Sequence, residues 1–410
     1  MNKRMDRSRL NIGAYILQPY ARTEEHIRDL SLCGVDFVVC MGNDRPALDL
    51  FEKYGVGAIV SGVVPGWWGG DGDNAGTLAE KNPIEKYLAA AEGFEDHPAV
   101  WGIDIGDEPS ALDFPHYGKV FASVDKAFPN QFPYLNLYPN YASVAKNDAE
   151  QTVNQLGTAT YAEHIEEYCK NVPADYICYD FYLYSINVEK AYDNLCVVAD
   201  ACRRTGRDMW IVLQVNSSDP NVWMSENMLR FQAYTAMAFG AQNIIWACYT
   251  AGWWHNQVLD GNGEKTQQYE KLKKVNAEIS ELGKTYMKFD RVSTHFVGFG
   301  EDHPHMSEVS QSPVEKLSTG TFIDLCEKDG APLVVGQMKS RHSDGARALM
   351  ICAADDPADV APAKRRVTFR CDSASVSVWG GEGRLCLERG CDGAYAFDLP
   401  SNGGAIVVAR

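Results

Sequence analysis

Residues 100–127 read V-W-G-I-D-I-G-D-E-P-S-A-L-D-F-P-H-Y-G-K-V-F-A-S-V-D-K-A, and this stretch decides the fold. Its short apolar start predicts a strand over Val100–Ile105. From Phe114 to Ala127 the apolar residues recur at helical spacing, which predicts a helix. A strand followed by a helix that leads back to another strand is the repeating unit of a parallel α/β sheet.

Seven further units of this kind flank the first. The predicted strands are Leu10–Gln18, Val35–Met41, Val56–Val64, Phe132–Tyr138, Tyr176–Tyr182, Met209–Val215 and Asn243–Tyr249. The predicted helices are Glu24–Cys33, Pro46–Tyr54, Pro83–Glu95, Tyr161–Lys170, Val188–Arg204, Glu226–Phe239 and Tyr269–Met287. Eight units in a chain segment of about this length predict a closed (β/α)8 barrel of the TIM type. A doubly wound open sheet is the alternative, although no G-x-G-x-x-G follows the first strand.

The helical spacing disappears after about residue 289. Short apolar runs between Gly, Asp and Pro clusters replace it, at Leu333–Gln337, Ala348–Cys352, Arg366–Phe369, Ser375–Trp379 and Ala405–Val408. Such runs are typical of a small antiparallel β domain. We therefore expect a barrel over residues 1–289 and a sandwich-like β domain over residues 290–410.

Composition excludes several classes of protein. The 410 residues are 45% hydrophobic and 23% charged, which is ordinary globular usage. The net charge of −17 disfavours binding to nucleic acid or to an anionic membrane surface. The chain shows no apolar run long enough to span a bilayer and no signal-peptide pattern, so we expect a cytoplasmic protein. The sequence leaves the oligomeric state open.

The twelve cysteines follow no metal-binding or redox pattern. They include no C-x-x-C pair and no Cys/His pair with zinc-like spacing. Several lie in apolar strand-like runs, where a free thiol behaves as a small core residue. We expect reduced, buried thiols, no metal and no cofactor.

In such a barrel the active site lies at the C-terminal ends of the strands. Here those positions are rich in carboxylates, amides and aromatic rings and poor in Lys and Arg, which disfavours phosphorylated substrates. Amides and carboxylates hydrogen-bond hydroxyl groups, and flat aromatic faces suit the C–H faces of a sugar ring. The expected sugar-binding residues are Trp67, Trp68, Asp104, Asn136, Tyr138, Tyr182, Gln214, Trp246, Tyr249, Trp253 and Trp254. Some of these tryptophans could instead fill the core.

The fourth predicted strand leads into two adjacent carboxyl groups, Asp107 and Glu108, followed by Pro109. Adjacent carboxylates repel each other, so the pKa of one can rise. A Glu with a raised pKa can protonate a leaving glycosidic oxygen at neutral pH. The alternative is that the pair only caps the next helix, because acidic residues suit helix N-termini.

A third carboxyl group, Asp180, stands among aromatic residues at the end of the sixth predicted strand. It could be a nucleophile, a base for water, a partner of Asp107 or simply a hydrogen-bonded residue of the barrel rim. The separation of two catalytic carboxyl groups decides between retention and inversion at the sugar carbon.

The segment Asp107-Glu108-Pro109 resembles the Asn-Glu-Pro motif of the large clan of retaining glycosidases built on (β/α)8 barrels. The resemblance implies that Glu108 is the acid/base at the end of strand four, with Asp107 in place of the Asn. The clan's nucleophile is a Glu at the end of strand seven, where this sequence has Gln214 and Asn216. Neither side chain can form a glycosyl-enzyme ester, so the usual two-carboxylate scheme lacks its nucleophile.

The same strand is similar to the D-x-x-D-x-D-x-E motif of chitinases and endo-β-N-acetylglucosaminidases. Asp104 and Glu108 match two of its acids, while Trp101 and Gly106 replace the other two. Strand six of those enzymes often ends in Met-x-Tyr-Asp, to which residues 177–180 (I-C-Y-D) are similar.

Two further features resemble hexosaminidases. Strand eight of the chitinases ends in a Trp, and Trp246 lies near the end of the eighth predicted strand here. Other substrate-assisted hexosaminidases carry an adjacent Asp-Glu pair, which Asp107-Glu108 resembles. In those enzymes the acetamido oxygen of the substrate is the nucleophile, the Asp orients it, and the Glu is the acid/base.

The sequence therefore predicts a glycoside hydrolase acting on small oligosaccharides or glycoconjugates. Glu108 is expected to donate the proton, Asp107 to position the substrate and tune Glu108, and Asp180 to be the second carboxylate. One alternative is a substrate-assisted N-acetylhexosaminidase that uses the Asp107-Glu108 pair. Another is a non-catalytic carbohydrate-binding barrel, which Gln214 at the nucleophile position keeps open.

Overall fold

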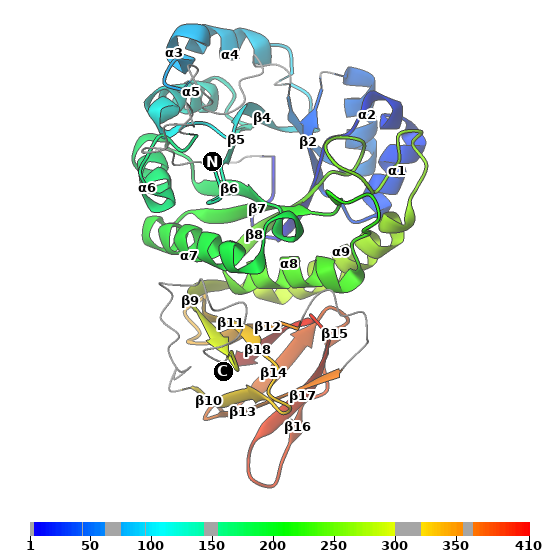
Figure 1. Ribbon diagram of the computed structural model, residues 1–410, viewed down its shortest axis with the longest axis vertical. Helices are drawn as coiled ribbons and strands as arrows, with labels where there is room; N and C mark the ends of the chain where they lie inside the picture. The colour runs from blue at the N-terminus through cyan, green and yellow to red at the C-terminus, as the bar shows by residue number, and fades with distance from the viewer. Residues whose placement is uncertain are drawn as a thin grey trace.

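The computed structural model describes residues 4–42, 44–61, 75–94, 96–142, 155–299, 321–355 and 364–410. Eight parallel strands close into a barrel in chain order (Figure 1). They are β1 (Asn11–Tyr15), β2 (Phe37–Met41), β3 (Gly57–Val60), β4 (Val100–Asp107), β5 (Phe132–Leu137), β6 (Tyr176–Phe181), β7 (Asp208–Gln214) and β8 (Ala241–Ala247). The closing pair is β1 with β8, so the predicted (β/α)8 barrel is confirmed and the open sheet is excluded.

Helices cover the outside of the barrel (Figure 1). They are α1 (Glu24–Leu32), α2 (Arg45–Tyr54), α3 (Leu78–Lys81), α4 (Ile84–Ala91), α5 (Phe114–Ala127), α6 (Tyr161–Asn171), α7 (Val188–Thr205), α8 (Glu226–Ala238) and α9 (Gln267–Tyr286). The predicted helix Pro83–Glu95 is shorter than expected. Pro83 is its N-cap, and Gly93 adopts a left-handed conformation (φ 94°) just beyond its end. No helix in the described ranges is both long and apolar enough to cross a membrane.

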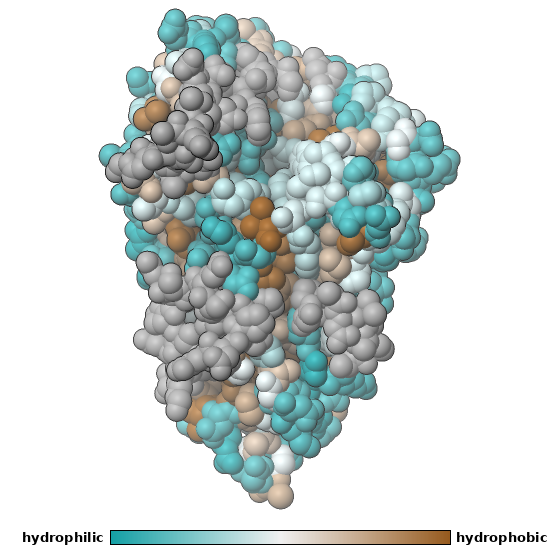
Figure 2. Space-filling view, viewed as in Figure 1, coloured by the Kyte–Doolittle hydropathy of each residue, from teal (hydrophilic) through white to brown (hydrophobic). Residues whose placement is uncertain are grey.

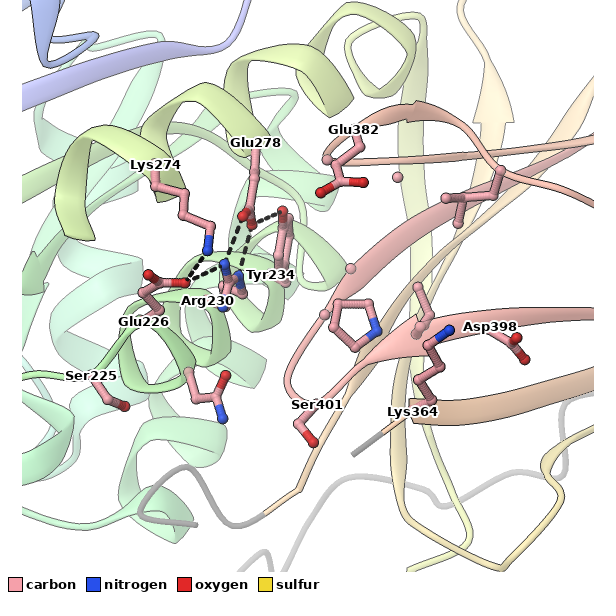
Figure 3. Close-up of a pocket in the computed structure, with 18 residues that line it drawn as sticks. Ser225, Glu226, Arg230, Tyr234, Lys274, Glu278, Lys364, Glu382, Asp398 and Ser401 are labelled. Atoms are coloured by element: carbon pink, nitrogen blue, oxygen red, sulfur yellow. Dashed lines mark hydrogen bonds and ion pairs between the residues drawn. The ribbon is translucent and has the colours of Figure 1, made fainter. Parts of the chain in front are cut away.

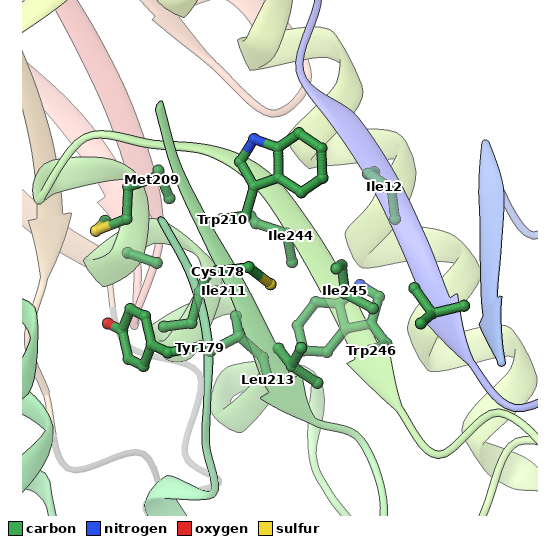
Figure 4. Close-up of a cluster of buried hydrophobic side chains, with 14 of the residues drawn as sticks. Ile12, Cys178, Tyr179, Met209, Trp210, Ile211, Leu213, Ile244, Ile245 and Trp246 are labelled. Atoms are coloured by element: carbon green, nitrogen blue, oxygen red, sulfur yellow. The ribbon is translucent and has the colours of Figure 1, made fainter. Parts of the chain in front are cut away.

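The interior of the barrel is filled near its N-terminal end. The ring of Trp210 stacks on Tyr176 with centroids 4.2 Å apart and meets Phe132 edge-on at 5.3 Å. The Arg7 guanidinium lies over the Trp210 ring, 5.8 Å from its centroid, and its Nε donates to Asp208 at 2.9 Å. Figure 4 shows Trp210 at one edge of a cluster of buried side chains from the neighbouring strands. The carboxyl groups of β4 and β6 lie at the opposite, C-terminal end of the barrel.

The C-terminal residues form two antiparallel sheets, which confirms the predicted β domain. The six-stranded sheet has the order β15-β14-β18-β12-β11-β9 and the four-stranded sheet the order β10-β13-β17-β16. The bounds are β9 (Phe289–Val297), β10 (Phe322–Glu327), β11 (Leu333–Ser340), β12 (Arg347–Ala353), β13 (Lys364–Cys371), β14 (Val376–Gly380), β15 (Gly383–Arg384), β16 (Glu388–Arg389), β17 (Tyr395–Pro400) and β18 (Gly404–Ala409).

The central strands β12 and β18 of the six-stranded sheet are buried on both faces. On β12, Met350 and Cys352 join the core shared with the barrel, while Leu349 and Ile351 pack toward the four-stranded sheet. This division follows the alternation of side chains along a strand. Helix α8 lies between the barrel and this sheet (Figure 1), and it too is buried on nearly all sides. The β domain is thus fixed to the barrel by a continuous apolar core.

A cavity of about 790 Å³ lies beside this contact, between α8, α9 and the β domain (Figure 3). Arg230 donates to both carboxylate oxygens of Glu278 at 2.7 Å and to Glu226 at 2.8 Å, and Lys274 lies 2.7 Å from Glu226. These charged groups compensate one another. The cavity contains none of the predicted sugar-binding residues.

The outer surface agrees with the acidic, polar composition. Figure 2 shows mostly hydrophilic residues on the viewed face of both domains, with hydrophobic ones in small separate patches. Patches of that size are ordinary for a globular protein.

The contact between the domains predicts a sensitive glycine. A Cβ at Gly336 of β11 would lie 2.2 Å from the carbonyl oxygen of Ala238 in α8. Gly336→Ala should therefore lower the free energy of unfolding by about 1–3 kcal/mol, as overpacking does. Urea denaturation measures this change. The matched variant Gly261→Ala, whose Cβ would meet nothing within 4 Å, should not destabilise the protein; equal losses in both would contradict the packing described.

Candidate active site

Strand β4 turns two aspartates into the barrel by an irregularity in its pairing. Its register with β5 shifts between Asp104 and Gly106, which leaves Ile105 as an extra residue. In a regular strand Asp104 and Asp107, three positions apart, would face opposite sides. Gly106 faces outward, since a Cβ there would lie 2.2 Å from the Tyr117 hydroxyl on α5. The shift thus brings both carboxyl groups to the inner side.

Glu108 follows in a left-handed conformation, with φ 45°. Side chains other than Gly rarely adopt this region, at a cost on the order of 1 kcal/mol or more. Its backbone N–H donates to the carbonyl of Asn136 at 2.9 Å, which holds the turn. Its carboxyl group shares a hydrogen bond with Asp180 from β6. Backbone strain at this one residue therefore aims Glu108 at the carboxylates beside it.

Asn136 of β5 joins two of the predicted catalytic residues. Its Nδ2 donates to Asp107 Oδ1 at 3.1 Å and to Asp180 Oδ1 at 2.8 Å. Asn136 and Asp180 are only 3% and 2% exposed, so these contacts are shielded from water. The structure brings together Asp107 at the end of β4, Glu108 directly after it and Asp180 of β6.

Two tyrosines that the sequence analysis missed complete the cluster. The Tyr15 hydroxyl hydrogen-bonds Asp107, and the Tyr141 hydroxyl donates to Asp180 Oδ2 at 3.5 Å. Tyr15 is the last residue of β1, but the predicted strand ran on to Gln18 and so hid it. Tyr141 lies in the segment after β5, where no periodicity marks which side chain turns inward.

Burial dominates the electrostatics of the site. It raises the pKa of Asp104 to about 7, although Ser61 donates to that carboxylate at 2.6 Å and the Gly106 N–H at 3.1 Å. Burial also raises the pKa values of Asp107 and Asp180, against the lowering effect of the Asn136 amide. These groups therefore hold protons at pH values where exposed carboxyls have lost them.

Three predicted sugar-binding aromatics gather beside the carboxyl groups. The Tyr182 ring meets Trp254 edge-on at 5.0 Å and Trp253 at 5.9 Å, and Trp253 meets Tyr15 at 5.6 Å. Asn216 donates to the Trp253 carbonyl at 2.7 Å and so holds the segment after β8 in place. Tyr182, Trp253 and Trp254 are each partly exposed, as residues that contact a ligand must be.

Trp246 and Tyr249 do not line this site, contrary to expectation. Trp246 is fully buried and its Nε1 donates to Asn276 of α9 at 2.8 Å, so it faces the helices. Tyr249 is also fully buried, and its electrostatic neighbours are Cys33, which follows α1, and Tyr269 of α9. Trp246 is a core residue because side chains of a barrel strand alternate between the interior and the helical layer. Tyr249 lies beyond the end of β8 and is also in the core.

Tyr138 and Gln214 are likewise turned to structural partners. The Tyr138 ring is buried 6.4 Å from His164 of α6. The Gln214 amide is fully buried; its oxygen accepts from the Tyr184 N–H at 3.1 Å and its nitrogen donates to Ser185 at 3.2 Å. Neither side chain is therefore presented to the carboxyl cluster.

Three predicted sugar-binding residues remain to be placed. Asp104 lies in the cluster as predicted from its strand, whereas Trp67 and Trp68 lie outside the described residues. Within the described ranges, no three His, Cys, Asp or Glu side chains are arranged to hold a metal ion.

The buried carboxyl groups make stability depend on pH. Asp104 has a raised pKa of about 7 in the folded protein, so its contribution to stability is full below about pH 4 and is lost as the pH rises to about 7. Asp104→Asn removes the charge and should raise the free energy of unfolding by up to about 4 kcal/mol near pH 8, relative to its effect near pH 4. Urea denaturation at the two pH values tests this. The exposed Asp372→Asn should change little at either, and a pH-independent effect of Asp104→Asn would contradict the buried charge.

No protein-family model and no curated protein matches the chain in sequence. Solved structures match it in fold. One is a catalytic mutant of Gan42B, a GH42 β-galactosidase from G. stearothermophilus, with 8% identity, a TM-score of 0.58 and 100% of both chains covered. Another is a Paenibacillus sp. cycloisomaltooligosaccharide glucanotransferase complexed with cycloisomaltoheptaose, with 8% identity, a TM-score of 0.57, and 98% of this chain and 85% of that one covered. The chain therefore has a glycosidase-type (β/α)8 fold.

Proposed function

We propose that this protein is a glycoside hydrolase in which Glu108 protonates the departing glycosidic oxygen. The observation that carries the proposal is the cluster of Glu108, Asp107 and Asp180 at the C-terminal end of the barrel, beside partly exposed Trp253 and Trp254. A carboxyl that shares a hydrogen bond with a second, buried carboxyl is suited to carry the proton that a general acid must donate. The fold shared with a β-galactosidase agrees with this chemistry.

The proposed cleavage has two proton transfers. The Glu108 carboxyl gives its proton to the glycosidic oxygen while the bond from that oxygen to the anomeric carbon breaks. The positive charge that develops on the sugar ring is stabilised by the neighbouring carboxylate Asp107. Glu108, now ionised, takes a proton from the water that adds to the anomeric carbon, and this step restores the free enzyme.

Asp180 is better suited to hold the proton on Glu108 than to attack the sugar. The paired carboxyl groups of retaining enzymes are about 5–5.5 Å apart and those of inverting enzymes about 6.5–9.5 Å. A direct hydrogen bond between Glu108 and Asp180 brings their oxygens closer than either arrangement. A sugar cannot lie between two groups in such contact, so we assign Asp180 as the partner that tunes Glu108.

A second candidate is substrate-assisted cleavage of 2-acetamido sugars. One observation favours it: β7 ends in Gln214, whose buried amide is bonded to Tyr184 and Ser185, so this strand supplies no nucleophile. The acetamido oxygen of the substrate would then attack the anomeric carbon. Asp107 would accept the hydrogen bond of the acetamido N–H, and Glu108 would remain the acid/base.

Replacing the proton donor tests the proposed function. Glu108→Gln cannot give up a proton and should lower kcat/KM by about 10²–10⁴-fold. The measurement is hydrolysis of a panel of glycosides of weakly acidic phenols, including N-acetylhexosaminides, by the native protein and the variant. The exposed Glu85→Gln on α4 is the matched control and should keep full activity. Turnover that is unchanged in Glu108→Gln would contradict the assignment, and sugar binding without any turnover by the native protein would favour a non-catalytic barrel.

A thiazoline inhibitor separates the two candidate mechanisms, because it resembles the cyclic intermediate formed by an acetamido group. If the substrate supplies the nucleophile, the thiazoline should bind the native protein at least 10²-fold more tightly than the parent sugar, as transition-state analogues do. Asp107→Asn should lose most of that gain. Titration calorimetry gives both affinities. Turnover of plain hexosides with no thiazoline binding would instead require an enzyme nucleophile.

A further inference from the structure

Every polar atom of the Asn136 side chain has a protein partner. Its two Nδ2 hydrogens go to Asp107 Oδ1 at 3.1 Å and Asp180 Oδ1 at 2.8 Å. Its Oδ1 faces the thiol of Cys178, which donates at 3.5 Å. The side chain is 3% exposed. Both donors are used and the side chain is buried, so the expected role in substrate binding does not account for this residue.

The orientation of the amide is determined by its surroundings. An amide nitrogen can only donate hydrogen bonds, and a thiol or hydroxyl is the donor suited to the amide oxygen. The opposite orientation would place Oδ1 against two carboxyl oxygens and the nitrogen against Cys178. Behind Cys178, the Tyr134 hydroxyl lies 3.4 Å from the sulfur and extends the network. The nitrogen of Asn136 therefore faces the carboxyl groups.

The remaining oxygens of the two aspartates also face donors. Asp180 Oδ2 receives the Tyr141 hydroxyl at 3.5 Å, and Asp180 shares a further hydrogen bond with Glu108. Asp107 receives the Tyr15 hydroxyl in addition to Asn136. A carboxyl surrounded by donors is stabilised in its ionised form. In the contact between Glu108 and Asp180, the proton then belongs on Glu108.

We propose that Asn136 is a positioning residue whose two hydrogen bonds favour the ionised forms of Asp107 and Asp180 and thereby place the shared proton of the cluster on Glu108. The effect on catalysis rests on the proposed function, whereas the location of the proton is a property of the protein without substrate. Asn136 acts through the carboxyl groups and does not itself touch the sugar.

Other titratable groups face this cluster from the surrounding elements. Burial raises the pKa of Asp104 to about 7, so its own titration is removed by making the test in an Asp104→Asn background. Burial raises the pKa values of the phenols and thiols, which keeps them neutral below about pH 9. They are Tyr15 of β1, Cys40 of β2, Tyr134 of β5, Tyr141, Cys178 of β6 and Tyr182.

The first test is the pH profile of kcat/KM for Asn136→Leu, which keeps the size of the side chain and removes both donors. The acidic limb should move up by about one pH unit, because the carboxylates lose two hydrogen bonds that favour their ionised forms. The matched control is Asn276→Leu, a buried amide that bonds Trp246 and Cys33 in the helical layer. Its profile should keep the native limbs. A profile of Asn136→Leu that is lower at every pH with unmoved limbs would overturn the proposal.

The second test needs no substrate and distinguishes failure of this proposal from failure of the proposed function. Difference infrared spectroscopy near pH 7.5 follows the C=O stretch of protonated carboxyl groups. In the Asp104→Asn background, Glu108→Gln should weaken this signal, and the remainder belongs to Asp180, whose pKa is raised by burial. Adding Asn136→Leu, or Asn136→Ala if the first does not fold, should strengthen the signal again, since a neighbouring aspartate then takes the proton. A signal of unchanged size in Glu108→Gln alone would overturn the assignment of the proton, whatever sugar the protein hydrolyses.

Discussion

The arrangement of the site depends on how β4 ends. One extra residue at Ile105 turns both Asp104 and Asp107 inward. The left-handed backbone of Glu108 then brings the Glu108 side chain to Asp180. Without these two departures from a regular strand, the three carboxyl groups of β4 would be divided between the interior and the helical layer. Irregularities of this kind, which cost conformational energy, are found where a side chain must be aimed.

Concentrating carboxyl groups in one buried place creates an electrostatic cost, and the surrounding donors offset part of it. An amide, tyrosine hydroxyls and a serine hydroxyl supply hydrogen bonds without adding positive charge. Neutral donors lower the pKa values less than a buried Lys or Arg would, so protons remain bound near neutral pH. The protein thus keeps a group able to act as an acid, at the expense of stability at alkaline pH. That trade-off is common in active sites.

The sequence predicted the barrel, the β domain and the carboxyl groups that meet at one end of the barrel because each has a periodic or local signature. Asp107 and Glu108 end a strand, and Asp180 ends another, so their meeting at one end of a barrel follows from topology. The sequence does not predict which of two consecutive side chains faces the barrel interior, because it locates the ends of strands only to within one or two positions. Tyr15 was missed for this reason, and Trp246 and Tyr249 were wrongly assigned to the site. The pairing shift at Ile105 has no signal in the sequence at all.

The central claim is that Glu108 protonates the leaving group, and its most direct test is the dependence of rate on the acidity of that group. The measurement is kcat/KM for a series of aryl glycosides of one sugar, with leaving groups from strongly to weakly acidic phenols. The native protein should show a shallow dependence, because proton donation makes poor leaving groups depart. Glu108→Gln should show a steep dependence, with near-native rates for the most acidic phenols. Equal slopes for the two proteins would contradict the account.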